Sequence, residues 1–137
     1  MSQEILSKAV LDKLCSDKST GSVHALLAGR IYHLRAPDET LLPWLNFTLS
    51  QDQPQAWFDA SDDVECQVTL DLWSKGSNGI LVAQIINDKL HALLHRQHLT
   101  IDGYAQSQMV CMDRGVAQIH GQAIRIRSIW RLWASRV

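Results

Sequence analysis

A strict alternation of apolar and polar side chains over residues 64–73 constrains this chain more than any other feature. Its apolar members are Val64, Cys66, Val68, Leu70 and Leu72, and polar side chains such as Glu65 and Asp71 separate them. Successive residues of a strand point to opposite faces of a sheet. The run therefore predicts a strand with one buried and one polar face. A second run of the same kind, residues 124–133, lies near the end of the chain.

An amphipathic helix separates the two runs. Its apolar residues recur at three- and four-residue spacing: Val82, Ile85, Ile86, Leu90, Leu93 and Leu94. Other patterns predict a first helix over residues 2–15, a short helical segment over 23–28, and strands over 30–34, 44–49, 107–112 and 121–134. The predicted order is thus helix, three strands, helix, two strands.

This order predicts an α+β fold. Hairpin-length links between the first strands and between the last two favour mostly antiparallel pairing. Because both strong strands have one apolar face, the main amphipathic helix is expected to pack on one face of a sheet of about five strands. The whole chain, residues 1–137, has a length typical of one domain.

Composition and charge exclude several classes of protein. Hydrophobic residues make up 46% and charged residues 20% of the chain, as in ordinary globular proteins. The net charge of −1 lacks the excess of basic residues that DNA-binding domains use against phosphates. Three widely separated cysteines do not form the framework of a disulfide-rich secreted domain. With no signal-peptide pattern and no long apolar run, the sequence predicts a soluble intracellular protein without membrane contact.

Motifs of catalysis are absent from the sequence. The chain contains no GxSxG nucleophile turn, no GxxxxGK[ST] phosphate loop and no closely paired cysteines. Cys66 falls on the apolar side of its predicted strand, where a small buried side chain is expected rather than a nucleophile. We therefore expect no enzymatic activity, no catalytic residues and no cofactor.

Three histidines raise the question of a metal site. His91, His95 and His98 lie near the end of the main predicted helix, at spacings that allow them to share a face. Zinc sites use such spacings, but no acidic residue of the HExxH type lies between them and no cysteine is near in sequence. Histidines also suit the negative end of a helix dipole. The pattern favours a solvated helix end over a metal site.

The outward face of the last predicted strand carries Arg125, Arg127, Arg131 and Trp133. If this strand neighbours residues 64–73, its arginines lie near Glu65 and Asp71 and form cross-strand charge pairs. Alternatively, this face is a subunit or partner interface, because arginine and tryptophan are enriched at interface hot spots. Both interpretations stay open at this point.

A second candidate for contacts is the aromatic pair Trp57 and Phe58. These two side chains lie inside a polar stretch, residues 51–62, that reads as a connection between strands. They are unusual for a solvated loop. They either pack back on the core or contact a partner.

Short motifs follow one another in a characteristic order along the chain. Gly29-Arg30-Ile31-Tyr32, Ala36-Pro37 and Leu42-Pro43-Trp44-Leu45 come after the first helix; Val68-Thr69-Leu70-Asp71-Leu72-Trp73-Ser74 precedes the main helix; Trp130-Arg131-Leu132-Trp133 closes the last strand. In this order they resemble the tail-completion or tail-terminator proteins of long-tailed bacteriophages, prophages and gene-transfer particles. The likeness covers nearly the whole chain, although Leu99–Arg114 matches no pattern of that family.

The resemblance implies a structural virion protein at the head–tail junction. Members of that family assemble as a homo-oligomeric ring, commonly a hexamer, in the cytoplasm of the host bacterium. The ring caps the completed tail tube, stops further polymerisation of the tail tube protein and offers a docking surface to the head connector protein. DNA passes through the centre without specific contacts, and the family has no catalytic residues.

Two alternatives remain open from the sequence. One is a neighbouring head–tail connector component, such as a stopper or adaptor. The other, from a different class, is a small nucleic-acid- or metal-binding module. A double-stranded RNA-binding module shares the helix–three strands–helix order but grips phosphates with lysines at the start of its last helix. Here Gly79, Ile80 and Leu81 bring no charge to that position.

Overall fold

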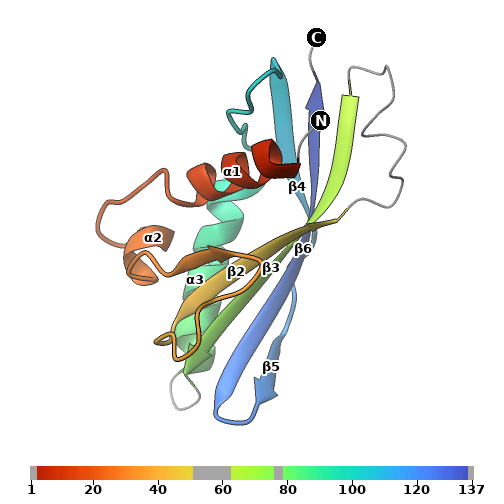
Figure 1. Ribbon diagram of the computed structural model, residues 1–137. Coiled ribbons are helices and arrows are strands. Elements are labelled where there is room, and N and C mark those ends of the chain that lie inside the picture. The colour runs from red at the N-terminus through yellow and green to blue at the C-terminus, as the bar shows by residue number, and fades with distance from the viewer. Residues whose placement is uncertain (1–2, 51–62, 76–78, 136–137) are drawn as a thin grey trace.

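The computed structural model describes residues 3–50, 63–75 and 79–135 (Figure 1). Its elements are α1 (Gln3–Leu14), α2 (Val23–Leu26), β1 (Ile31–His33), β2 (Trp44–Ser50), β3 (Asp63–Lys75), α3 (Gly79–Leu94), β4 (Gln106–Asp113), β5 (Ala117–His120) and β6 (Ala123–Ser135). The predicted α+β class and the helix–strands–helix–strands order are confirmed. None of the described helices has the length and apolarity needed to span a bilayer.

The strands form one mixed sheet in the order β1-β2-β3-β6-β4, with β5 also paired to β6. β1 and β2 run parallel, whereas the other neighbours are antiparallel. The mostly antiparallel pairing predicted from the short links is therefore confirmed, with one parallel pair added at the edge. The long strands β3 and β6 form its centre, and they pair over their full length, from Asp63 with Ser135 to Lys75 with Ala123 (Figure 1).

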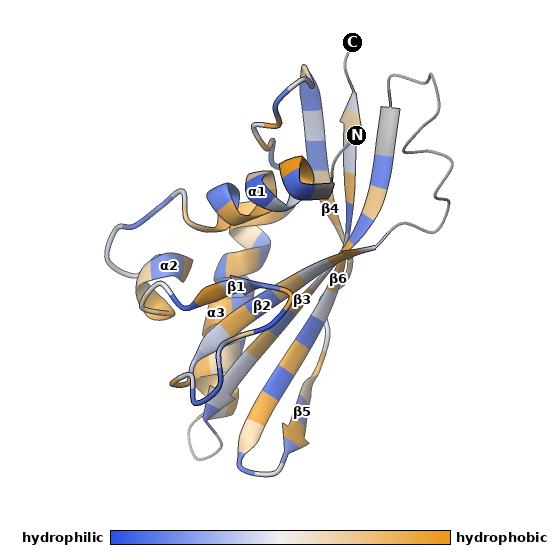
Figure 2. Cartoon of the chain, in the orientation of Figure 1, coloured by the Kyte–Doolittle hydropathy of each residue, from blue (hydrophilic) through white to orange (hydrophobic). Residues whose placement is uncertain are grey.

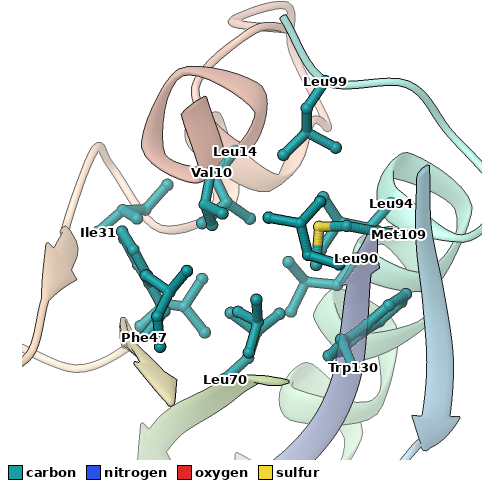
Figure 3. Close-up of a cluster of buried hydrophobic side chains, with 14 of the residues drawn as sticks. Val10, Leu14, Ile31, Phe47, Leu70, Leu90, Leu94, Leu99, Met109 and Trp130 are labelled. Atoms are coloured by element: carbon teal, nitrogen blue, oxygen red, sulfur yellow. The ribbon is translucent and has the colours of Figure 1, made fainter. Parts of the chain in front are cut away.

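Helices α1 and α3 lie on the same face of the sheet (Figure 1), and the core fills the space between. Apolar and polar residues alternate along β3 and β6 (Figure 2), as the sequence predicted. Every second side chain of each strand therefore reaches the helices. Figure 3 shows the resulting cluster, in which Leu70 of β3 and Trp130 of β6 lie below Leu14 of α1 and Leu90 of α3.

The buried stripe of α3 differs from the predicted one. The helix buries Gly79, Ala83, Ile86, Leu90 and Leu94, whereas Val82 and Ile85 are exposed. The small residues explain the difference. A Cβ at Gly79 would lie 3.3 Å from the Ser74 hydroxyl oxygen and 3.4 Å from a methyl of Ile124, so the first turn of α3 sits directly on the sheet. Close approach favours Gly79 and Ala83 over the larger side chains beside them.

β5 is a strand that the sequence did not predict. The sequence predicted only two strands after the main helix, over residues 107–112 and 121–134. In the structure, Ala117–His120 also forms a strand, which pairs with the first residues of β6, Ala123–Ile126, beyond the part of β6 that pairs with β4. The strand has only four residues and a mostly exposed burial pattern. Alternation therefore gave no signal there.

Gly115 makes the step from β4 to β5 possible. Its φ is +78°, and a Cβ at this position would lie 2.1 Å from the Arg127 carbonyl oxygen. We expect Gly115→Ala to lower the free energy of unfolding by about 2 kcal/mol or more, because left-handed strain and a backbone clash add. Gly121→Ala is the control: its φ is +64° but nothing lies within 4 Å of its Cβ position. Urea unfolding that finds equal losses in both variants would contradict the clash.

Candidate subunit interface

Among the residues that the structure describes, no helix lies on the second face of the sheet. We call it the uncovered face; it consists of the side chains of β2, β3 and β6 that alternate with the core residues. Both α1 and α3 lie on the opposite side (Figure 1). The segment after β1 borders this face, where the Asn46 side-chain amide donates a hydrogen bond to the Leu34 carbonyl oxygen at 2.9 Å.

An arginine–aspartate pair lies at the middle of the uncovered face. Asp71 of β3 and Arg127 of β6 are directly opposite in the antiparallel register. The guanidinium Nε and one Nη donate to the two carboxylate oxygens at 2.8 and 3.0 Å. This hydrogen bond to Asp71 raises the pKa of Arg127. The carboxylate is mostly enclosed, with 13% of its side chain exposed, whereas 49% of the arginine side chain is exposed.

A weaker pair lies further along the same strands. Arg131 approaches Glu65 at 3.8 Å between Nη1 and Oε1, and more than half of each side chain is exposed. Solvent screens such a contact, so its contribution to stability is small. The guanidinium of Arg131 is therefore available to a partner.

Aromatic rings form a row across one end of the uncovered face. Trp44 of β2 stacks on Trp73 of β3 with 5.5 Å between ring centroids. His120 of β5 contacts Trp73 at 5.6 Å, and the Arg125 guanidinium carbon lies 5.9 Å from the centroid of the same ring. Arg125 also donates to the Gln118 side-chain oxygen at 2.8 Å. We call Trp44, Trp73 and His120 the aromatic row.

The structure brings together the four predicted residues of the last strand. Arg125, Arg127, Arg131 and Trp133 all lie on the uncovered face, and the conditional prediction of charge pairs with Glu65 and Asp71 is confirmed. Trp57 and Phe58 lie outside the described residues. Trp44 and His120 join the same face but were not among the candidates. Trp44 could have been found, because it alternates with the apolar residues of a predicted strand. His120 could not, because its strand, β5, was not predicted.

A shallow pocket of about 420 Å³ adjoins the aromatic row. Trp44, Trp73 and Asp71 form its floor, and residues 34–40 form one wall. Nearby, the Oδ1 of Asn46 and the Nε of Arg125 are buried without a hydrogen-bond partner among the residues that the structure describes. Such groups cost stability in an isolated subunit. Their position on a face without helices is typical of a contact surface.

The three histidines at and after the end of α3 do not converge on a common point. His91 stacks on His95 at 4.5 Å between centroids, and His95 Nδ1 accepts a hydrogen bond from the Cys111 backbone N–H at 3.1 Å. His98 instead contacts the Ser107 carbonyl oxygen through its own Nδ1 at 2.8 Å. Burial, followed by the charge of Arg114, lowers the pKa of His91. Within the described ranges, no group of three or more His, Cys, Asp or Glu side chains could hold a metal ion.

The thiols are likewise placed as packing groups. Cys66 is buried in the core, as predicted, and burial raises its pKa to about 12. Burial also raises the pKa values of Cys15 and Cys111. A thiol with a raised pKa holds little thiolate at neutral pH and is a poor nucleophile.

Residues 8–122 match the family described as Tail completion protein gp17. A solved structure from the virion of a native gene transfer agent particle matches with a TM-score of 0.66 at 14% sequence identity, over 98% of this chain and 99% of that one. A second solved structure matches with a TM-score of 0.67 at 12% identity, over 98% and 96% of the two chains. At these identities the two structures share the fold. The search of curated proteins finds no match.

Proposed function

This chain belongs to the Tail completion protein gp17 family, and from that premise we propose that it closes the finished tail tube of a phage as a ring of identical subunits. Membership gives it a structural role in the phage tail. The finer proposal is that the ring stops polymerisation of the tube protein and binds the head connector. DNA then crosses its central opening during ejection.

The single observation that carries this proposal is the uncovered face. A sheet that has helices on one side only leaves a large ordered surface of arginine, tryptophan and carboxylate side chains toward its surroundings. Arginine and tryptophan are the residues that dominate binding energy at interfaces.

A ring also places a requirement on the subunit. Cyclic association of identical chains in a head-to-tail sense uses two different patches on each subunit. The uncovered face supplies one candidate patch, centred on Arg127 and Arg131. The low net charge of −1 suits an opening through which DNA must slide, because each neutralised phosphate adds affinity.

Deletion of the gene, with complementation by the intact chain, tests this function. We expect tails of the deletion mutant to be irregular in length and unattached to heads in electron micrographs, and we expect the chain to restore both properties. A stopper or adaptor gives a different result, namely tails of normal length beside heads that leak DNA. That result would transfer the assignment to the neighbouring connector component.

The ring itself is tested by mass. Six subunits of 15.4 kDa predict an assembly of roughly 90 kDa. We expect this mass for the isolated chain in sedimentation, or for the protein bound to purified tails if the finished tube triggers its assembly. A chain that remains monomeric in both settings contradicts the ring.

A further inference from the structure

The two halves of one sheet edge differ in how they are protected. β4 and β5 follow each other along the same side of β6. The outer edge of β4 is closed by residues 95–99: Arg96 N–H donates to the Met109 carbonyl oxygen at 2.6 Å, and His95 accepts from the Cys111 N–H. No strand in the described part of the chain pairs with the outer edge of β5, which forms the border of the sheet (Figure 1).

β5 also lacks the devices that keep edge strands from pairing. Proteins protect such strands with charged side chains, proline or bulges. Residues 117–120 are Ala, Gln, Ile and His, with neither a formal charge at neutral pH nor a proline. Ile119 is 75% exposed. The outer edge of β4 is covered by residues 95–99, whereas the neighbouring edge of β5 is neither covered nor protected by any residue that the structure describes. This difference indicates that β5 has a partner strand.

Each face of the sheet offers an apolar site next to β5. On the helix side, a groove of about 440 Å³ runs between Ile80 of α3 and Ile119, above the buried Ile124. We call it the α3–β5 groove; among the described residues its lining includes Lys75 and no aspartate or glutamate. On the uncovered face, His120 is the last ring of the aromatic row. A strand added to β5 would therefore place successive side chains against one apolar site on each face.

The sequence contains one segment with matching chemistry. Trp57 and Phe58 are the only two adjacent aromatic residues of the chain, so in an extended strand they point to opposite faces. Around them, residues 51–62 include Asp52, Asp59 and Asp62 and no lysine or arginine. The negative charge of this segment complements Lys75 at the groove.

The segment cannot reach β5 of its own chain. Trp57 is separated from Asp63 by 63 − 57 = 6 residues, which span at most roughly 21 Å when fully extended. Ile119 pairs with Ile124, and Ile124 pairs with Ser74. Ser74 is 74 − 63 = 11 residues along β3 from Asp63, about 36 Å at the usual rise of a strand. Asp63, to which the segment is joined, is therefore too far from β5 of its own chain, so the occupant comes from a second copy.

We propose that residues 51–62 of one subunit add as a strand to the outer edge of β5 in the next subunit, with one aromatic side chain in the α3–β5 groove and the other against His120. Strand addition to a free sheet edge uses backbone hydrogen bonds for affinity and alternate side chains for specificity. This contact rests on the proposed ring. It gives the ring the two unlike patches, at opposite ends of each subunit, that head-to-tail closure requires.

A labelled peptide of residues 51–62 tests the contact. The receptor is the full chain with Trp57→Ala and Phe58→Ala, so its own segment does not compete for the site in any assembly state. We expect the peptide to bind and to shift the backbone amide NMR signals of Gln118 and Ile119. Ile119→Asp in the receptor should weaken binding by about tenfold or more, as at an interface hot spot. The same loss is expected for a peptide that carries alanine at both aromatic positions.

Ile85→Asp in the receptor is the matched control. Like Ile119, Ile85 is an exposed apolar residue, but it lies on α3 and does not line the groove. Binding of the peptide should therefore stay unchanged. An unaltered thermal transition of both variants shows that folding is intact. The proposal is overturned if the wild-type peptide fails to bind, or if Ile119→Asp has no effect. If the chain forms a ring of the expected mass but the peptide does not bind, this contact alone is overturned. If the peptide binds but deletion of the gene leaves tail completion unaffected, the proposed function is overturned instead.

Discussion

Leu70→Asp is expected to abolish folding of this protein. Leu70 is 1% exposed at the middle of β3, with Phe47 of β2 and Ser128 of β6 as its neighbours in register. Loss of the leucine side chain alone costs about 2–5 kcal/mol, and an unpaired carboxylate in the core costs several kcal/mol more. The sum matches the whole stability of a typical domain, roughly 5–15 kcal/mol. We expect circular dichroism to show no cooperative thermal transition.

Thr69→Asp provides the control for this substitution. The same charge is introduced one residue away on β3, but on the uncovered face, opposite Ile129 and diagonal to Arg127 and Arg131. Water and two guanidinium groups accommodate the carboxylate there, so the variant should unfold cooperatively with a stability within about 1 kcal/mol of the parent chain. A cooperative transition of normal amplitude in Leu70→Asp would contradict the burial of this strand face in the core.

The fold could be predicted from the sequence where the alternation of apolar and polar residues along a strand matches its buried and exposed positions. β3 and β6 each have one face under the helices, and most positions of their sequences follow that partition; the buried Ser74 and Ser128 are exceptions. The same regularity in the sequence predicts that Arg125, Arg127 and Arg131 share one surface. Charge pairing followed because Asp71 and Glu65 occupy the matching phase of the neighbouring strand.

The remaining features depend on tertiary contacts that leave no periodic signal. Val82 and Ile85 satisfy the three–four spacing of a buried stripe, but the start of α3 lies so close to the sheet that it buries the small residues Gly79 and Ala83 instead. β5 is short and mostly exposed, so its pairing with β6 is decided by the turn through Gly115 rather than by hydrophobicity. The aromatic row likewise joins three strands that are distant in the sequence. Register, rather than local pattern, brings its members together.

Exchange of the charges at positions 71 and 127 is expected to separate the two roles of Arg127. Arg127→Glu alone places two carboxylates directly opposite each other in neighbouring strands. Repulsion costs roughly 0.2–1 kcal/mol, and loss of the hydrogen bonds to the enclosed Asp71 carboxylate costs about 1–3 kcal/mol more. The sum is below the stability of a typical domain, so the variant should still fold. If the uncovered face binds a neighbouring subunit or the head connector, reversal of its central charge should nevertheless prevent ring formation and the joining of tails to heads.

The double variant Asp71→Arg with Arg127→Glu restores an attractive pair within the sheet. Its stability in urea should return to within a few tenths of a kcal/mol of the parent chain, because the cross-strand contact is formed again with reversed polarity. Joining of tails to heads should remain lost, since the partner still meets a carboxylate where it requires a guanidinium. Recovery of joining in the double variant would assign the whole defect of Arg127→Glu to the pair inside the subunit. In that case the interface would have to be sought at Arg131, Trp133 and the edge of β5 rather than at the centre of the uncovered face.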